Sequence, residues 1–169
     1  MNTEVKFAKV HPNAIIPSKR DEDMGFDIYA CFDESYIIIE PHETKLIPTG
    51  IASVCSSEYG FLLRERGSTG SKGIALRAGV IDSGYRNEWF VGLTNTTDKL
   101  LFISKFPEER TIEIYGKLDK PIFVYPYSKA IAQALVVPIP KVDVEEISYE
   151  DLKSIESERG LGKLGSSNK

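Results

Sequence analysis

Short runs of β-branched and aromatic residues, separated by Gly, Pro, Asn and Asp, constrain the fold of this chain more than any other feature. Each run holds four to seven residues, and the runs recur along most of the chain. Such regular punctuation is typical of an all-β sandwich or barrel. No strand pattern alternates with a long helical pattern, which argues against a parallel α/β sheet. The predicted strands cover residues 4–10, 26–32, 36–39, 44–48, 60–63, 89–95, 100–104, 111–115, 122–125 and 131–137.

One segment near the C-terminus has the pattern of a helix. Residues 148–155 begin with Ser148, which can cap the helix, and Asp151 occupies the capping-box position. The last residues, 156–169, are rich in Gly, Ser and charge and hold too few large apolar side chains to order themselves. A length of 169 residues suits one domain. We therefore predict a barrel domain over residues 1–155, with one short helix, and a flexible tail over residues 156–169.

Composition and charge exclude several classes of function. The net charge of -4 argues against general binding to duplex nucleic acid, which needs a clustered excess of Lys and Arg. No apolar run approaches the roughly 20 residues that span a bilayer, and the N-terminus lacks a secretion signal. Cys31 and Cys55 are too few for a disulfide framework and lack the spacing of a zinc site. The chain is expected to be cytoplasmic, with no membrane and no nucleic acid among its partners.

Residues 78–95 carry the most informative pattern for chemistry. Asp82 and Tyr85 stand three residues apart in a Gly-containing turn between two apolar runs. A hairpin of this kind can offer backbone N–H and C=O groups to a planar base, while Tyr85 packs on a sugar and Asp82 faces a water. An Asp in a hairpin is usually a turn former. The pattern alone leaves both interpretations open.

Two Gly-rich segments have the chemistry of phosphate-binding loops. Residues 64–73 combine three glycines with hydroxyls and three cations, and residues 159–167 repeat the theme with Arg159, three glycines and paired serines. Consecutive backbone N–H groups in such loops form anion sites, and Arg adds bidentate contacts to phosphate. The first loop lacks the Walker A spacing. The structural alternatives are a surface turn for the first and a frayed chain end for the second.

Two polar residues lie within apolar runs. Asp27 lies in Met-Gly-Phe-Asp-Ile, and Gln133 lies in Lys-Ala-Ile-Ala-Gln. A buried Asp or Gln must find partners, because leaving it unpaired costs roughly 1–3 kcal/mol. Structural pairing is the commoner explanation for each residue.

Taken together and in order, these five stretches resemble the five motifs of the trimeric deoxyuridine triphosphatase (dUTPase) family. The resemblance extends from Gly25 to Ser167. It implies a jelly-roll-like β-barrel and a homotrimer in which each active site draws on more than one subunit. It also implies hydrolysis of dUTP to dUMP and pyrophosphate with the help of Mg2+.

The resemblance further implies a role for each motif residue. Asp82 would activate the water that attacks the α-phosphorus, and Tyr85 would lie under the deoxyribose. Asp27 would hold waters on the magnesium ion, and the tail from Arg159 would close over the nucleotide as a lid. The implied substrate-binding residues are Arg66, Gly67, Ser68, Gly79, Val80, Ile81, Tyr85, Gln133, Arg159, Leu164, Gly165, Ser166 and Ser167.

The chain departs from the family pattern at several positions. It has Arg66-Gly67-Ser68 where the family usually has Arg-Ser-Gly, and Leu164 where the family usually stacks a Phe on uracil. Tyr127-Ser128 replaces the usual Gly-Asp of the fourth motif. Residues 96–126 are longer than the ordinary connection and resemble the added segment of some phage and Gram-positive members. We predict that they form a surface hairpin outside the catalytic site that a protein partner could contact.

Two other functions compete with this interpretation. The dCTP deaminases share the fold, but their chemistry needs a Glu about ten residues beyond the Asp of the third motif, and this chain has Gly92 there. A regulatory protein that binds the nucleotide as a signal could retain every motif. The sequence does not exclude that role.

Overall fold

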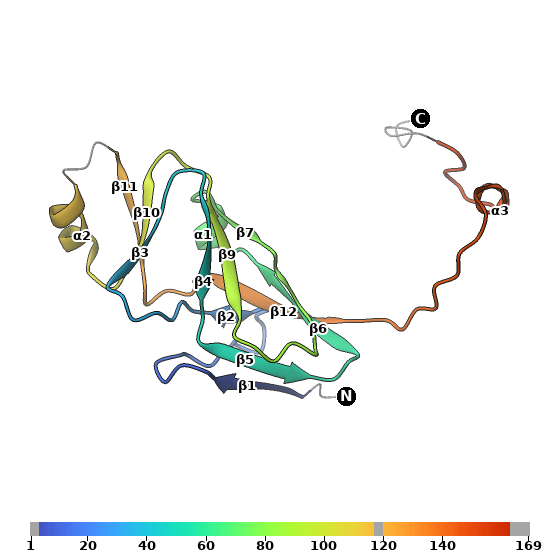
Figure 1. Cartoon of the computed structure of the whole chain (residues 1–169), viewed down its shortest axis with the longest axis horizontal. Coiled ribbons are helices and arrows are strands. Elements are labelled where there is room, and N and C mark those ends of the chain that lie inside the picture. Colours follow the sequence, from blue (N-terminus) through green and yellow to red (C-terminus); the bar gives the residue numbers. More distant parts are fainter. Residues whose placement is uncertain (1–3, 117–119, 163–169) are drawn as a thin grey trace. The chain divides into compact units, whose positions relative to one another are not determined.

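A computed structural model describes residues 4–116 and 120–162, which form mainly β-strands (Figure 1). The chain separates into two compact units, one ending at Ile139 and one starting at Pro140. None of the helices in the described residues has the length and hydropathy that crossing a bilayer requires. The strands are β1 (Val5–Lys9), β2 (Phe26–Ile28), β3 (Tyr36–Ile39), β4 (Thr44–Pro48), β5 (Ile51–Cys55), β6 (Tyr59–Arg64), β7 (Ile74–Arg77), β8 (Val80–Ile81), β9 (Phe90–Asn95), β10 (Leu100–Ser104), β11 (Ile122–Pro126) and β12 (Ala132–Pro138).

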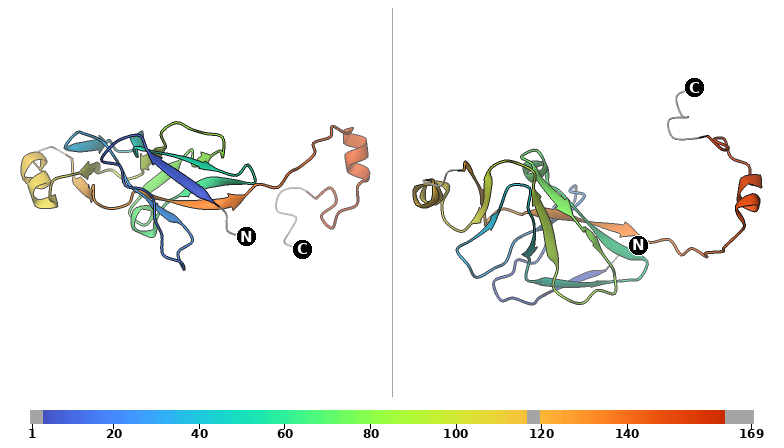
Figure 2. Two further views of the ribbon diagram at one scale, coloured as in Figure 1. Left: turned by 90° about the horizontal axis from the view of Figure 1, so that it is seen from below. Right: turned by 45° about the horizontal axis from the view of Figure 1, so that its top comes forward.

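The strands of the first unit form four small sheets (Figures 1 and 2). Their orders are β1-β5, β11-β10-β3, β2-β12-β6-β8 and β4-β9-β7, and most neighbours along the chain do not pair with one another. Every pair is antiparallel except β10 and β11. The predicted all-β fold is confirmed.

An aromatic cluster lies at the centre of the first unit. The Trp89 and Phe61 ring centroids are 4.8 Å apart, and Phe7 packs edge-on against Trp89 at 5.6 Å. These rings join aliphatic side chains from the other sheets, such as Ile39 of β3 and Ile47 of β4, in one buried core. Burying a side chain of this size contributes about 1.5–3 kcal/mol, so the core holds the sheets in the arrangement that positions the loops.

The added segment is not the hairpin that the sequence predicted. Residues expected as a strand, 111–115, lie in helix α2 (Glu108–Tyr115), and β10 runs parallel to β11. Thr111 is buried, and its hydroxyl bonds to Ser104 Oγ at 3.0 Å and Pro107 O at 3.1 Å. Tyr115 packs with Tyr36 and Phe102 in a second core. These tertiary contacts outweigh the strand propensity of the β-branched residues, and a parallel pair requires such a crossover.

The second unit carries the predicted C-terminal helix. Helix α3 covers Tyr149–Ser154, and Ser148 Oγ accepts a hydrogen bond from the Asp151 amide at 3.0 Å, so the predicted cap is confirmed. With α2 and α1 (Gly67–Gly70), the described residues contain three short helices rather than one. The first unit ends at Ile139, and α3 lies in the second unit. The division at residue 155 into a barrel domain and a flexible tail stays a prediction. Among the described residues of this unit, the large apolar side chains, such as Val144, are exposed.

Candidate functional site

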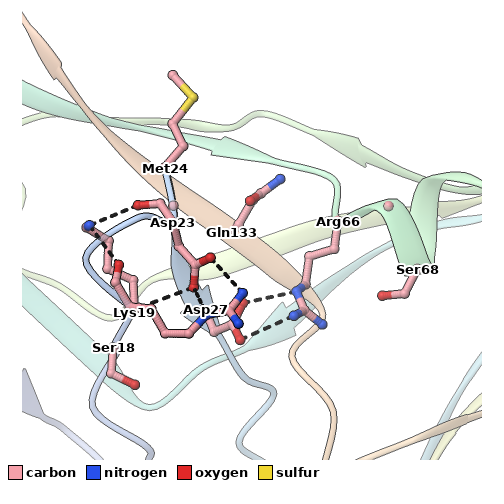
Figure 3. A pocket seen from close by; sticks show the side chains of 11 residues that line it. Ser18, Lys19, Asp23, Met24, Asp27, Arg66, Ser68 and Gln133 are labelled. Carbon is pink, nitrogen blue, oxygen red and sulfur yellow. Dashed lines mark hydrogen bonds and ion pairs between the residues drawn. The ribbon is translucent and has the colours of Figure 1, made fainter.

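One polar pocket of about 770 Å³ gathers five of the residues that the sequence singled out (Figure 3). Asp27 comes from β2, Gln133 from β12, and Arg66, Gly67 and Ser68 from the start of α1. The first, second and fourth motifs, far apart in the sequence, thus meet in one chain. The remaining lining residues are Ser18, Lys19, Arg20, Asp23, Met24 and Gly25.

Strand register brings these residues together. Gln133 lies opposite Asp27 across the β12–β2 pair and opposite Arg64 across the β12–β6 pair. Arg66 follows two residues after Arg64, where the chain leaves β6. Because neighbouring strands are about 4.8 Å apart, the polar side chains at these positions share one end of the sheet.

An ion pair joins Asp27 and Arg66 across the pocket (Figure 3). Arg66 Nε lies 3.0 Å from Asp27 Oδ1, and Arg66 Nη2 donates to Asp27 Oδ2 at 3.2 Å. Both side chains are about one-third exposed. The residue implied for phosphate and the residue implied for magnesium therefore contact each other directly.

Gln133 is fixed by its backbone neighbours. Its Nε2 donates to the Glu65 carbonyl at 2.8 Å, and a Cβ on Gly25 would lie only 2.9 Å from Gln133 Oε1. Residue 25 must therefore lack a side chain for Gln133 to occupy this position. The Glu65 carboxylate accepts a bond from the Leu76 amide at 3.0 Å, which lowers the pKa of Glu65 and ties the loop to β7.

The predicted phosphate loop is a single helical turn. Thr69 is buried, and its hydroxyl bonds to the Arg66 amide at 3.1 Å and the Arg66 carbonyl at 3.0 Å. Ser71 Oγ donates to the Gly67 carbonyl at 2.6 Å. These bonds close the turn on itself and leave Ser68 exposed at the pocket.

The pocket also contains a turn that sequence reasoning missed. Residues 18–23 supply Lys19, Arg20 and Asp23 to its lining. Lys-Arg followed closely by Asp-Glu-Asp, just before Gly25, is a signal that could have revealed it, because alternating charge blocks at this spacing can pair within one turn. The sequence analysis made no prediction for these residues.

The Asp82–Tyr85 turn lies at the edge of the same sheet. Strand β8 pairs with β6 on the side opposite β12, and Gly79 is so close to β6 that a Cβ would lie 2.6 Å from the Leu63 carbonyl. The Tyr85 amide bonds to the Asp82 carbonyl at 3.1 Å, and the Tyr85 hydroxyl donates to the Glu88 carbonyl at 3.1 Å.

This turn does not belong to the predicted simple hairpin. The strands that pair are β7 and β9, and β8 leaves them to join β6. Neither Asp82 nor Tyr85, nor any residue of β8, lines the pocket. Ile81 lies opposite Phe61, three residues and about 10 Å along β6 from Arg64, and Asp82 continues away from it.

The other implied site residues lie in the second unit or outside the described residues. Arg159 is exposed, and its Nε donates to the Gly162 carbonyl at 3.3 Å. Leu164, Gly165, Ser166 and Ser167 fall outside the described residues. Within the part of residues 96–126 that the structure describes, none lines the pocket.

Comparison with known proteins identifies the family of this chain. The dUTPase family model matches residues 11–110. The deoxyuridine 5'-triphosphate nucleotidohydrolase of Nautilia profundicola is 34% identical over 170 residues, covering 98% of this chain and 99% of the relative. The enzyme of that name from Neisseria meningitidis serogroup B is 31% identical over 173 residues, covering 98% and 99%.

Solved structures show the same fold. A dUTPase variant of Staphylococcus bacteriophage 80alpha with dUpNHpp has a TM-score of 0.72 at 21% identity, covering 97% of this chain and 98% of that one. The native EIAV dUTPase has a TM-score of 0.60 at 20% identity, covering 86% and 98%. The sequence match and the motif residues that meet in one pocket together show that this chain belongs to the dUTPase family.

Proposed function

We propose that this chain hydrolyses dUTP to dUMP and pyrophosphate by attack of water on the α-phosphorus. The observation that carries the proposal is the single pocket in which Asp27, Arg66, Ser68 and Gln133 meet, in a chain of the dUTPase family. The reaction limits the uracil that enters DNA and supplies dUMP.

Phosphate binding falls to Arg66, Gly67, Ser68 and Gln133. The guanidinium of Arg66 already makes a bidentate contact to a carboxylate, and the same planar fork suits phosphate oxygens. The Ser68 hydroxyl is free to donate from the adjacent turn. An amide nitrogen has two hydrogens, so Gln133 Nε2 keeps one for the α-phosphate beside its bond to Glu65.

The Asp82–Tyr85 turn serves the nucleoside and the attacking water. The Asp82 side chain is exposed and able to accept the proton of the water. Tyr85 is held through its hydroxyl, so its ring presents a fixed face to the deoxyribose and leaves no room for a 2'-hydroxyl. Strand β8 is an edge strand. The Gly79 carbonyl accepts from the Leu63 amide at 2.6 Å, and those backbone groups of Gly79, Val80 and Ile81 that point away from β6 can bond to the edge of uracil.

The residues present fit a magnesium ion that is bound mainly by the triphosphate. Mg2+ usually takes one or two carboxylates together with substrate phosphates and waters. The described residues contain no group of three His, Cys, Asp or Glu that could hold a metal alone, but Asp27 stands in the pocket and would hold a water of the ion. A phage phi11 dUTPase structure is described as coordinating a structural Mg(II) ion. Bound Mg2+ would neutralise charge on the triphosphate.

The separation of the two groups supports a homotrimer with shared active sites. Asp82 and the pocket lie apart in one chain, and in a trimer a second copy brings its Asp82 turn to this pocket. Exposed apolar side chains on neighbouring strands, such as Leu46 and Phe90, offer surface for such a contact. In this arrangement a tail closes each site, with Arg159, Ser166 and Ser167 on the phosphates and Leu164 over the base.

The structure also bears on the deaminase alternative. A Cβ at Gly92 would lie 2.9 Å from the Arg77 carbonyl across the β7–β9 pair. This position therefore has no room for the Glu that deamination requires.

Pyrophosphate release from dUTP, dCTP, dTTP and UTP, with and without Mg2+, tests the proposal. We expect magnesium-dependent release from dUTP and far slower release from the other three. Equal rates with UTP would contradict the role of Tyr85, and ammonia release from dCTP would favour the deaminase.

A further inference from the structure

The turn over residues 18–23 is built around a lysine. Lys19 Nζ donates to the carbonyls of Arg20 at 3.1 Å, Asp21 at 3.5 Å and Asp23 at 2.8 Å. An ammonium group has three donors and no acceptor, so these contacts occupy it. Lys19 therefore holds the backbone of the turn in a defined shape at the edge of the pocket.

The same turn holds a second arginine in a fixed orientation. Arg20 Nε lies 2.9 Å from Asp23 Oδ2 and Arg20 Nη2 lies 2.8 Å from Asp23 Oδ1. The Arg20 amide donates to the same carboxylate at 3.2 Å. These bonds lower the pKa of Asp23 to about 2, so the carboxylate stays charged well below neutral pH.

Arg20 and Arg66 form similar pairs at different depths of one pocket. The Arg66 side chain is 30% exposed and the Arg20 side chain is 88% exposed. Arg20 also has hydrogens to spare, because a guanidinium carries five N–H donors and Asp23 occupies only those on Nε and one on Nη2. The Nη1 hydrogens can contact an anion while the pair with Asp23 stays intact.

We propose that Arg20 binds the terminal phosphate of the nucleotide, with Asp23 and Lys19 as positioning residues that hold its guanidinium at the rim of the pocket. This assignment rests on the proposed function, since it presumes a triphosphate whose inner phosphates lie on Arg66 and Ser68. A ligand that reaches from the depth of the pocket to its rim meets Arg66 first and Arg20 last. Arg20 therefore senses the length of the phosphate chain.

Binding of dUpNHpp and of dUMP by calorimetry tests the assignment with Arg20→Gln and Arg20→Lys. We expect Arg20→Gln to raise the Kd for dUpNHpp about 5- to 20-fold, as the loss of charge-assisted hydrogen bonds at an exposed site does, and to leave the Kd for dUMP unchanged. Arg20→Lys keeps the charge without the planar fork, so its Kd for dUpNHpp should lie between those of the unchanged protein and Arg20→Gln. Arg110→Gln, the same change of charge on exposed α2 outside this pocket, is the matched control.

Two results would overturn the assignment. One is a Kd for dUpNHpp within twofold of the unchanged protein in Arg20→Gln. The other is an equal weakening of dUpNHpp and dUMP, which would mean that the turn only shapes the pocket. Thermal unfolding of each variant checks the fold. Failure of the unchanged protein to hydrolyse dUTP would instead refute the proposed function, so the two failures are distinguishable.

Discussion

The pocket wall and the Asp82 turn are built in different ways. In the pocket wall, Asp27 and Arg66 are paired with each other and Gln133 is tied to a backbone carbonyl. In the turn, the Asp82 side chain is exposed, while the backbone around it is held in place. Strand register thus orients the side chains proposed to bind phosphate. The carboxylate of Asp82, the candidate general base, instead points outward, where a ligand or a second subunit can reach it.

Arg86 explains how an exposed turn keeps its shape. Its Nη1 donates to the carbonyls of Ser83, Tyr85 and Ser53, the last two at 3.2 Å and 3.4 Å. A cation bound to several carbonyls plays the same part here as Lys19 plays at the pocket rim. The backbone of the pocket wall and of the Asp82 turn is therefore held in place in both regions. They differ because Arg66 is paired with a carboxylate, whereas the Asp82 side chain is exposed.

The largest effect is expected in the turn, at Asp82. Asp82→Asn should lower kcat by about 10²- to 10⁴-fold and leave the Kd for dUpNHpp nearly unchanged, because only the proton acceptor is lost. Single-turnover hydrolysis and calorimetry measure the two quantities. Near-normal turnover would show that Asp82 is only a turn former.

Mixing two inactive variants tests whether the two regions meet between subunits. Asp82→Asn and Arg66→Gln should each be inactive alone. After random subunit exchange, each site has roughly one chance in four of drawing both intact groups from different copies, so up to about a quarter of full activity should return. Absence of recovery after exchange confirmed by mass spectrometry would contradict shared sites.

Removal of the tail should have the next largest effect. Truncation after Ser157 should lower kcat/KM by about 10- to 100-fold without unfolding the first unit, because a tail that closes as a lid would exclude water and position the triphosphate. Turnover is compared with the oligomeric state from size-exclusion chromatography. Full hydrolysis by a folded, truncated trimer would show that the tail has no catalytic part.

Substitutions at Leu164 should change binding by a smaller factor. Leu164→Phe offers a ring that can stack on the base and should maintain or tighten binding of dUpNHpp by a few-fold. Leu164→Asp should weaken it, since a carboxylate would be placed against an apolar face near phosphate. The reverse order of affinities would contradict the contact with the base.

The smallest effects are expected in the added segment. Ile114→Ser changes a half-exposed side chain on α2 and should alter stability by less than about 0.5 kcal/mol with unchanged turnover. Thr111→Val removes a buried hydroxyl from its partners and should cost about 1 kcal/mol, again with unchanged turnover. Chemical denaturation and steady-state kinetics separate the two quantities, and a large loss of kcat would assign the segment to catalysis.

The segment between β10 and β11 cannot be replaced by a short turn. Such a replacement would have been possible if the two strands had formed the predicted hairpin. Ser104 ends β10 beside the end of β11, so the chain must return the whole length of the strand before β11 begins. Sequence patterns indicated the strands on either side but not their relative direction, because direction depends on which neighbour each strand finds.

Local patterns predicted most of the strands, the Ser148 cap and five of the residues that line the pocket. They missed β5 and β7 and wrongly predicted a strand over residues 111–115. Asp27 and Gln133 drew attention because a polar side chain in an apolar run needs a partner, and the structure supplies one for each. Lys19, Arg20 and Asp23 escaped notice because charged residues in a loop look alike in sequence. Their ion pair and backbone bonds depend on how the turn closes.

The sequence by itself determined the β-rich fold, the family and the types of side chain available for binding a nucleotide. These properties follow from residue identity and short-range periodicity. Only the tertiary structure decided that Arg66 rests on Asp27, that β8 leaves the β7–β9 pair for β6, and that Asp82 lies away from the pocket. The physical reason is that strand pairing joins residues far apart in the chain, and its register and partner are set by the packing of the whole core.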